Sequence, residues 1–138
     1  MKITNVEAWV VSPNLGTRIS DDFGDDWQWT FVTVETDEGI TGWGESSNVP
    51  RKASFLTGEG VRAVKEALIG ENPTDIERLW HKLFRRYTYL GSRGFPTTII
   101  SGIDIALWDI KGKATGRPVY DLLGGKMRED VRTYANVW

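Results

Sequence analysis

Residues 99–125 constrain the fold of this chain more than any other stretch. Their apolar side chains recur at helical spacing at Ile99, Ile103, Ala106 and Ile110. A second set, Ile100, Ile105 and Leu107, widens this apolar stripe. The polar remainder, Ser101, Asp104, Trp108 and Lys111, forms one narrow face. A helix that is apolar around most of its circumference must be covered on more than one side. The sequence therefore predicts a long core helix that ends near Gly116.

The composition is that of one ordinary globular domain, and it limits the partners that we expect. Of the 138 residues, 40% are hydrophobic and 26% are charged, and the net charge is −2. Without a basic field we expect no nucleic-acid partner, and without an apolar run near the roughly 20 residues of a membrane span we expect no membrane partner. The absence of cysteine excludes disulfides, thiol catalysis and cysteine metal sites. Because the N-terminus also lacks a signal-peptide pattern, we expect a cytoplasmic protein.

Three strand-like segments occupy the first third of the chain. Residues 2–11 and 28–36 are rich in β-branched and aromatic residues, and residues 40–45 follow a short turn at residues 37–39. Gly39 can take the positive φ that such a turn needs. Three consecutive strands joined by one tight turn predict an antiparallel meander.

Two helical patterns follow the strands. Apolar residues recur at helical spacing over about residues 59–69, which end at Gly70, and again over residues 76–87. Thr74 is a predicted N-cap of the second helix, because Glu77 three residues on completes a capping box.

Beyond the long helix, Pro118 suits the first turn of a short helix, and Gly124 with Gly125 suits its end. Residues 131–135 are strand-like but have no evident partner strand. The expected fold class is therefore α+β, a three-stranded antiparallel meander followed by a helical bundle.

Seven tryptophans are the compositional peculiarity of the chain, and four of them lie in the strand-like part: Trp9, Trp27, Trp29 and Trp43. Packing in the sheet and the core is the first interpretation of these residues. An aromatic platform for a sugar ligand is the alternative.

Local motifs supply no catalytic set. His81 is the only histidine, and the carboxylates of residues 21–26 do not follow the spacing of a calcium loop. Gly42 and Gly44 lie inside a strand and lack the third glycine of a nucleotide motif. We expect Asp104, inside the apolar helix, to make a polar tie to a neighbouring segment.

Two loops carry basic and hydroxyl side chains, namely Arg51, Lys52, Tyr89, Ser92 and Arg93. Such groups suit an anionic, hydroxylated ligand, although solvated loop residues would have the same composition. From the residues alone the chain is an α+β domain with loops that suit an acid, without an assigned reaction.

Four segments, taken in order, resemble the N-terminal part of the enolase superfamily. They are VETDEGITGWGE (residues 34–45), NPTDIERLWHKLFR (72–85), SGIDIALWDIKGKATGRPVYDLLGG (101–125) and VRTYAN (131–136). The similarity is greatest to the mandelate racemase and muconate lactonizing enzyme branch, especially its acid-sugar dehydratases. It implies a capping domain over residues 1–116, and a linking helix with the first strand of a TIM-type barrel over residues 117–138.

The resemblance also implies where the chemistry lies. The family's Mg²⁺ ligands and catalytic bases belong to later barrel strands, so none is expected among these residues, and we expect the chain to be part of a longer protein. The implied function is that of the substrate-specificity cap of a Mg²⁺-dependent acid-sugar dehydratase. That enzyme abstracts the proton α to a carboxylate and expels a β-hydroxyl from the enediolate. A racemase or cycloisomerase of the same superfamily, and a non-catalytic binding or oligomerisation module, are the alternatives.

The family's capping loops correspond to residues 13–27 and 46–55, and the resemblance implies that they bind the sugar acid. The predicted substrate-binding residues are Arg51, Asn48, Arg18, Trp27, Tyr89 and Arg93. The other expected partners are the missing barrel domain and further copies of the chain in a homo-oligomer. The implied full-length protein would be a lyase or isomerase, whereas residues 1–138 alone would not turn over substrate.

Overall fold

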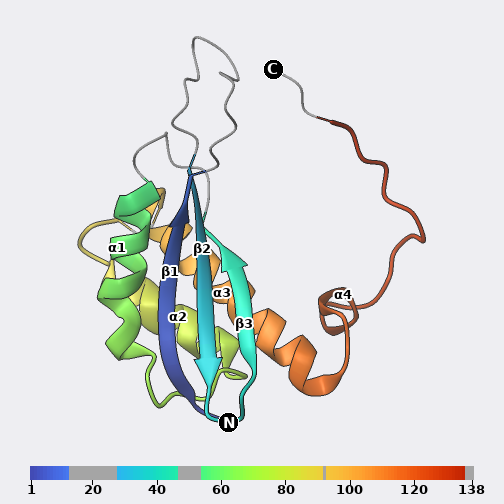
Figure 1. Ribbon diagram of the computed structural model, residues 1–138, viewed down its shortest axis with the longest axis horizontal. Coiled ribbons are helices and arrows are strands. Elements are labelled where there is room, and N and C mark those ends of the chain that lie inside the picture. Colours follow the sequence, from blue (N-terminus) through green and yellow to red (C-terminus); the bar gives the residue numbers. More distant parts are fainter. Residues whose placement is uncertain (13–27, 47–53, 92, 136–138) are drawn as a thin grey trace.

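Three strands form one antiparallel sheet, and the helices lie against one of its two faces (Figure 1). The computed structural model describes residues 1–12, 28–46, 54–91 and 93–135. Strand β1 (Ile3–Val11) pairs with β2 (Trp29–Thr36), which pairs with β3 (Thr41–Glu45). The three predicted strands and their meander are thereby confirmed.

The turn between β2 and β3 fixes the register of this hairpin. Gly39 adopts a φ of 78°, as the turn requires. The Thr36 hydroxyl donates to the Ile40 carbonyl oxygen at 2.9 Å and accepts from the Ile40 amide at 3.1 Å. As a result Val34 lies opposite Gly42.

Helix α1 (Ser54–Val64) begins earlier than the predicted start near Glu59. Its first turn is tied to β2, because the Thr30 hydroxyl donates to the Ser54 carbonyl at 2.9 Å and the Ser54 hydroxyl donates to the Gln28 carbonyl at 3.1 Å. The residues buried in this part of the helix are small or polar, so apolar spacing could not reveal it. The helix continues into a 3₁₀ turn, η2 (Lys65–Ala67).

Helix α2 (Ile76–Arg86) is confirmed, but its predicted N-cap is wrong. Asp75 occupies the cap position, and no side chain makes a cap hydrogen bond. The amide and hydroxyl of Thr74 instead donate to the Asn72 side-chain oxygen, at 3.1 and 2.9 Å. This local Asn turn competes with the capping box for the same hydroxyl.

Helix α3 (Phe95–Thr115) is covered on several sides by the chain itself, since it contacts β2, β3, α1 and α2. The core that it shares with them comprises Ile3, Val6, Ala8, Val32, Val34, Val61, Val64, Leu68, Ile76, Leu79, Leu83, Ile99, Ile100, Ile103, Ala106, Leu107 and Ile110. Ile105 departs from the predicted apolar stripe, because 47% of its surface is exposed. In the described part of the chain, α3 and the other helices are too short or too polar to cross a membrane.

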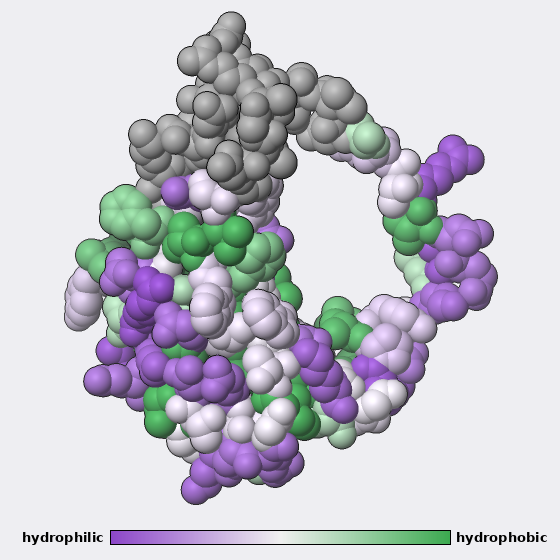
Figure 2. Space-filling view, viewed as in Figure 1, coloured by the Kyte–Doolittle hydropathy of each residue, from purple (hydrophilic) through white to green (hydrophobic). Residues whose placement is uncertain are grey.

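The segment after α3 packs against little of the domain. Gly116 ends α3 with a φ of 64°, as predicted, and α4 (Val119–Leu122) follows. The predicted strand over residues 131–135 is not formed, because within the described residues no other strand lies beside it to share hydrogen bonds. Figure 2 shows open space between this segment and the body of the domain.

Candidate functional site

The end of β1, the start of β2 and the end of β3, which flank the two predicted capping loops in the sequence, lie at one end of the sheet, the upper end in Figure 1. The register shows this, since Val11 lies opposite Trp29 and Phe31 lies opposite Glu45. Any ligand held by the two loops therefore meets the same end of the sheet. Four predicted substrate-binding residues, Arg51, Asn48, Arg18 and Trp27, lie outside the described residues.

A shallow pocket of about 400 Å³ lies at this end of the sheet, between β3 and the start of α3. It is lined by Glu45, Ser46, Arg93, Gly94, Thr97, Thr98 and Ser101. Four of these side chains are hydroxyls, one is a cation and one is a carboxylate. Such a lining can exchange hydrogen bonds with a chain of hydroxyl groups while Arg93 attracts an acid.

The first turn of α3 also belongs to this pocket. Gly94 is the N-cap with a φ of 74°, no side chain caps the helix, and the first turn contains no acidic residue. The first amides of a helix lack internal partners and carry a partial positive charge. Because Arg93 directly precedes this turn, the mouth of the pocket is locally positive despite Glu45.

Glycines bring β3 and α3 close enough to form the pocket wall. A Cβ at Gly42 would collide with the Ala106 carbonyl oxygen, and a Cβ at Gly44 would collide with that of Gly102. A Cβ at Gly102 would in turn collide with the Ser46 hydroxyl. The two glycines of β3 thus serve close packing of a helix on a strand, a role that their spacing alone did not reveal.

Buried polar atoms without partners gather at the same end of the sheet. In the described part of the chain these are Gln28 Oε1, Ser46 Oγ and Thr57 Oγ1. They come from the start of β2, the end of β3 and the first turns of α1. Since buried polar atoms are normally hydrogen-bonded, their concentration here marks this end as the polar part of the interior.

The two predicted residues that the structure describes lie in different surroundings. Arg93 lines the pocket, whereas Tyr89 is fully exposed after α2 and does not line it. The sequence analysis did not single out the hydroxyls of Thr97 and Thr98. They precede the apolar stripe of α3, and the only signal for them was the Thr-Thr pair after Pro96.

Among the residues that the structure describes, neither Asp104 nor His81 belongs to a catalytic arrangement. Burial raises the pKa of the Asp104 carboxyl, and the Glu77 carboxylate raises it further. The predicted polar tie of Asp104 is wrong, because within the described residues nothing donates a hydrogen bond to it. The His81 ring packs edge-on against the Trp80 ring, with 5.2 Å between centroids.

The acidic side chains of the described residues do not form a magnesium site. Within the ranges that the structure describes, no group of three or more His, Cys, Asp or Glu side chains is placed to hold a metal ion. These residues therefore do not fit the ligand set that Mg²⁺ requires, and no chemical step is assigned to them.

The arrangement of sheet and helices is that of the N-terminal domain of enolase superfamily enzymes. A member of this superfamily from Salmonella Typhimurium superposes with a TM-score of 0.78 at 38% identity, over 97% of this chain and 32% of that one. The 3,6-anhydro-D-galactonate cycloisomerase from Zobellia galactanivorans gives 0.77 at 33% identity, over 91% and 32%. A mandelate racemase/muconate lactonizing protein from Paracoccus denitrificans PD1222, complexed with magnesium, gives 0.75 at 35% identity, over 92% and 31%.

The sequence comparison identifies the family within this class. Residues 6–124 match the family described as mandelate racemase / muconate lactonizing enzyme, N-terminal domain, and the chain belongs to that family. A D-galactonate dehydratase of Variovorax paradoxus is 40% identical over 135 residues, 98% of this chain and 31% of the relative. One of Ralstonia pickettii is 46% identical over 110 residues, 78% of this chain and 28% of the relative. The chain thus spans about three-tenths of the length of these relatives.

Proposed function

We propose that this chain is the substrate-selecting N-terminal domain of a sugar-acid dehydratase. The observation that carries the proposal is the identity of 40–46% to proteins named D-galactonate dehydratase. In this proposal residues 1–116 form the capping domain, and residues 117–138 lead into a barrel domain that follows in the longer protein.

The pocket between β3 and α3 contributes the selection in this proposal. Its hydroxyl side chains and Glu45 exchange hydrogen bonds with the hydroxyls of a sugar acid, and Arg93 attracts the acid. The capping loops complete the site through Arg51, Asn48, Arg18 and Trp27, with Tyr89 at their margin. The domain acts by positioning the substrate and excluding water, and not by making or breaking bonds.

The bond chemistry belongs to the barrel. Magnesium there would stabilise the negative charge that develops when the α-proton is removed. Support for the metal comes from the magnesium-bound relative of Paracoccus denitrificans, and the described residues of this chain contain no group of three or more His, Cys, Asp or Glu side chains placed to hold it.

Exposed apolar side chains on the C-terminal side support docking of that barrel. Ile105 on α3 is 47% exposed, and further exposed side chains follow it along the chain: Tyr120, Leu123, Met127, Val131 and Tyr134. Several exposed apolar side chains in one part of a chain are typical of a segment that packs against a partner. We place the protein in the cytoplasm as a homo-oligomer.

A cycloisomerase is the second candidate. It rests on the similarity to the Zobellia galactanivorans enzyme, which is 33% identical over the aligned part. Because the reaction type is decided in the barrel, this domain is compatible with either reaction.

A chimera tests the proposed function. Residues 1–138 replace the corresponding N-terminal part of the Variovorax paradoxus D-galactonate dehydratase, and dehydration of a panel of sugar acids is measured with Mg²⁺. We expect turnover by the chimera, and we expect Arg93→Ala to raise KM at least about tenfold with kcat changed less. Arg85→Ala, an exposed cation outside the pocket, is the matched control. A folded chimera that turns over no sugar acid contradicts the proposal, as does an Arg93→Ala variant with an unchanged KM.

A further inference from the structure

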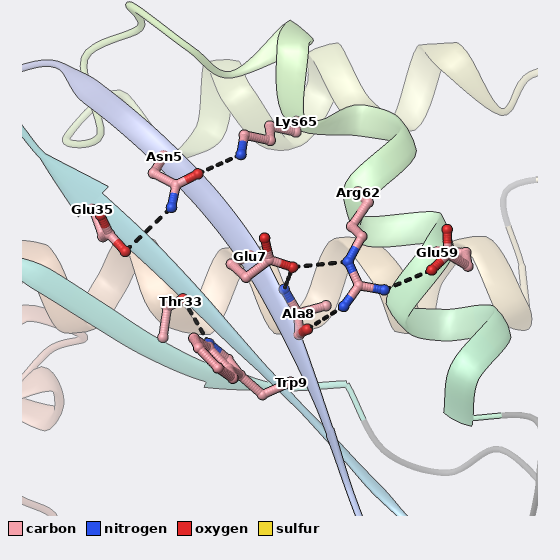
Figure 3. Close-up of polar contacts among 9 residues, drawn as sticks. All are labelled: Asn5, Glu7, Ala8, Trp9, Thr33, Glu35, Glu59, Arg62 and Lys65. Atoms are coloured by element: carbon pink, nitrogen blue, oxygen red, sulfur yellow. Dashed lines mark hydrogen bonds and ion pairs between the residues drawn. The ribbon is translucent and has the colours of Figure 1, made fainter.

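Strand β2 buries three threonines, Thr30, Thr33 and Thr36. Thr33 lies on the face of the sheet opposite the helices, where its hydroxyl accepts from the Trp9 indole N–H at 3.1 Å (Figure 3). Trp9 and Trp43 are each 52% exposed on that face, so the expectation that they pack in the core is wrong. Thr36 belongs to the turn at one end of the strand, and Thr30 lies near the other end, beside the predicted capping loops.

Thr30 joins three segments that are far apart in the sequence. Its hydroxyl donates to the Ser54 carbonyl oxygen at 2.9 Å, and its own carbonyl oxygen accepts from the Ser46 amide at 2.8 Å. The Ser54 hydroxyl in turn donates to the Gln28 carbonyl oxygen at 3.1 Å. Gln28 directly follows the first predicted capping loop, and Ser46 and Ser54 lie at the start and near the end of the second. Thr30 therefore connects the described residues next to both loops.

We propose that Thr30 is a positioning residue of the substrate-selecting site. The inference rests on the proposed function, and it assigns to Thr30 no contact with substrate, because the side chain is fully buried. Ser46 lines the pocket between β3 and α3, whereas Ser54 begins α1. By holding both residues against β2, Thr30 fixes the pocket relative to the start of α1. Such placement of binding groups is what productive substrate binding requires.

The polar residues at this end of the sheet favour a positioning role over simple packing. Ser46, Ser54 and Thr57 are buried there, as Thr30 is. Valine has the shape of threonine and also suits a strand, so packing alone would not call for a hydroxyl. Apolar contacts have no direction and would let the start of α1 slide along β2, whereas the hydrogen bond from Thr30 sets one position.

A second tie keeps the rest of α1 in place. About two turns after Ser54, Arg62 Nε donates to a Glu7 carboxylate oxygen at 2.8 Å, and Arg62 Nη2 donates to the Ala8 carbonyl oxygen at 2.5 Å (Figure 3). Loss of the Thr30 hydroxyl therefore loosens the first turn of α1 and leaves the helix on β1. A variant at Thr30 should consequently fold.

Thr30→Val tests the inference in the chimera with the dehydratase barrel, through KM and kcat for the sugar acid that the chimera dehydrates best. We expect KM to rise at least about threefold while kcat changes less than about twofold, because binding groups are displaced and the bond chemistry is untouched. Thr30→Ser keeps the hydroxyl and should restore KM. A rise in KM smaller than about threefold, a fall in kcat as large as the rise in KM, or no recovery with Thr30→Ser overturns the inference.

Thr36→Val is the matched control, since Thr36 is a buried threonine of the same strand whose hydroxyl also donates to a carbonyl oxygen, that of Ile40, at 2.9 Å. It lies at the opposite end of β2, so we expect it to lower the melting temperature and to leave KM unchanged. A rise in KM equal to that of Thr30→Val shows a general loss of stability and overturns the inference. If Thr30→Val does not fold, Ser54→Ala breaks the bond to Gln28 and takes its place, with the same expected rise in KM.

Amide exchange of Ser46 in the chain alone separates this inference from the proposed function. A folded chimera that turns over no sugar acid contradicts the proposed function. In the chain alone, Thr30→Val should speed exchange of the Ser46 amide at least about threefold, and Thr36→Val should not. Equal exchange in the two variants overturns the inference whether or not the chimera is active.

Discussion

The contact between β3 and α3 and the segment that follows α3 differ in what surrounds them. In the contact, Gly42 and Gly44 lie directly against the backbone of α3, and Ile103, Ala106 and Ile110 are fully buried. In the following segment, Met127 is 91% exposed and Tyr134 is 86% exposed. The first region therefore has its partners within residues 1–116, whereas the apolar side chains of the second lie exposed in the described part of the chain.

Gly44→Ala is expected to have the largest effect, because its Cβ would collide with the Gly102 backbone, which cannot move like a side-chain end. We expect a loss of about 3 kcal/mol or more in the free energy of unfolding, measured by urea denaturation. Gly91→Ala is the control, since Gly91 has a positive φ but open space around it, and it should cost about 1 kcal/mol. Equal costs would show that the close contact is not needed for stability.

Asp109→Ala is expected to have the next effect, since Asp109 ties α3 to the edge of the sheet. Its carboxylate accepts from the Trp43 amide at 2.8 Å and from Lys113 at 2.7 Å. Leaving that amide without its partner should cost about 1–2 kcal/mol in thermal unfolding. Asp121→Ala on α4 breaks an exposed ion pair with Arg117, which precedes that helix. We expect it to cost less than about 0.5 kcal/mol. The reverse order would contradict the comparison.

The ion pairs of Glu71 are expected to make the stability of the domain depend on pH in acid. Hydrogen bonds from Arg78 and then Lys82 lower the pKa of Glu71 to about 2 from its usual 4.5. A lowered folded-state pKa stabilises the fold above pH 4.5, and this contribution is lost as pH falls from about 4.5 towards 2. Because the ion pairs are solvated, we expect Glu71→Gln to cost about 1 kcal/mol at pH 7 and little at pH 2.

The control for Glu71 lies in the C-terminal segment. Glu129 pairs with Lys126 at 2.8 Å but is 83% exposed. Glu129→Gln should leave the unfolding midpoint unchanged at both pH values. A cost at Glu129 equal to that at Glu71 would remove the distinction between the two regions.

Deletion of residues 123–138 is expected to have the smallest effect. The described residues of this segment bury almost nothing against the domain, so the free energy of unfolding should change by less than about 0.5 kcal/mol. A large loss in calorimetry would show that the segment belongs to the folded unit.

The features that could be predicted from the sequence are those set by residues close together in the chain. Periodicity predicted the strands, and Gly116 predicted the end of α3, because these depend on neighbouring residues. Periodicity could not predict the approach of Gly44 to Gly102 or the tie from Asp109 to Trp43, since both depend on how distant segments pair. The N-cap prediction at Thr74 was wrong because the Thr74 hydroxyl donates to the Asn72 side-chain oxygen and does not cap α2.

The candidate site shows the same limit. From the sequence we named Arg93, which lines the pocket, and placed Ser46 in a predicted capping loop, but we did not single out Thr97, Thr98 or Ser101 as site residues. Their hydroxyls converge only when the end of β3 meets the start of α3.

Hydrogen–deuterium exchange of the chain and of the chimera with the dehydratase barrel tests the central claim most directly. In the chain alone, the amides of β1, β2 and α3 should exchange slowly, and those of residues 123–135 should exchange at the rate of an unfolded peptide. In the chimera, residues 123–135 should become protected, because in the proposed function the barrel would supply the partners of this segment. Protection of that segment in the chain alone, or its continued rapid exchange in a folded chimera, would contradict the account.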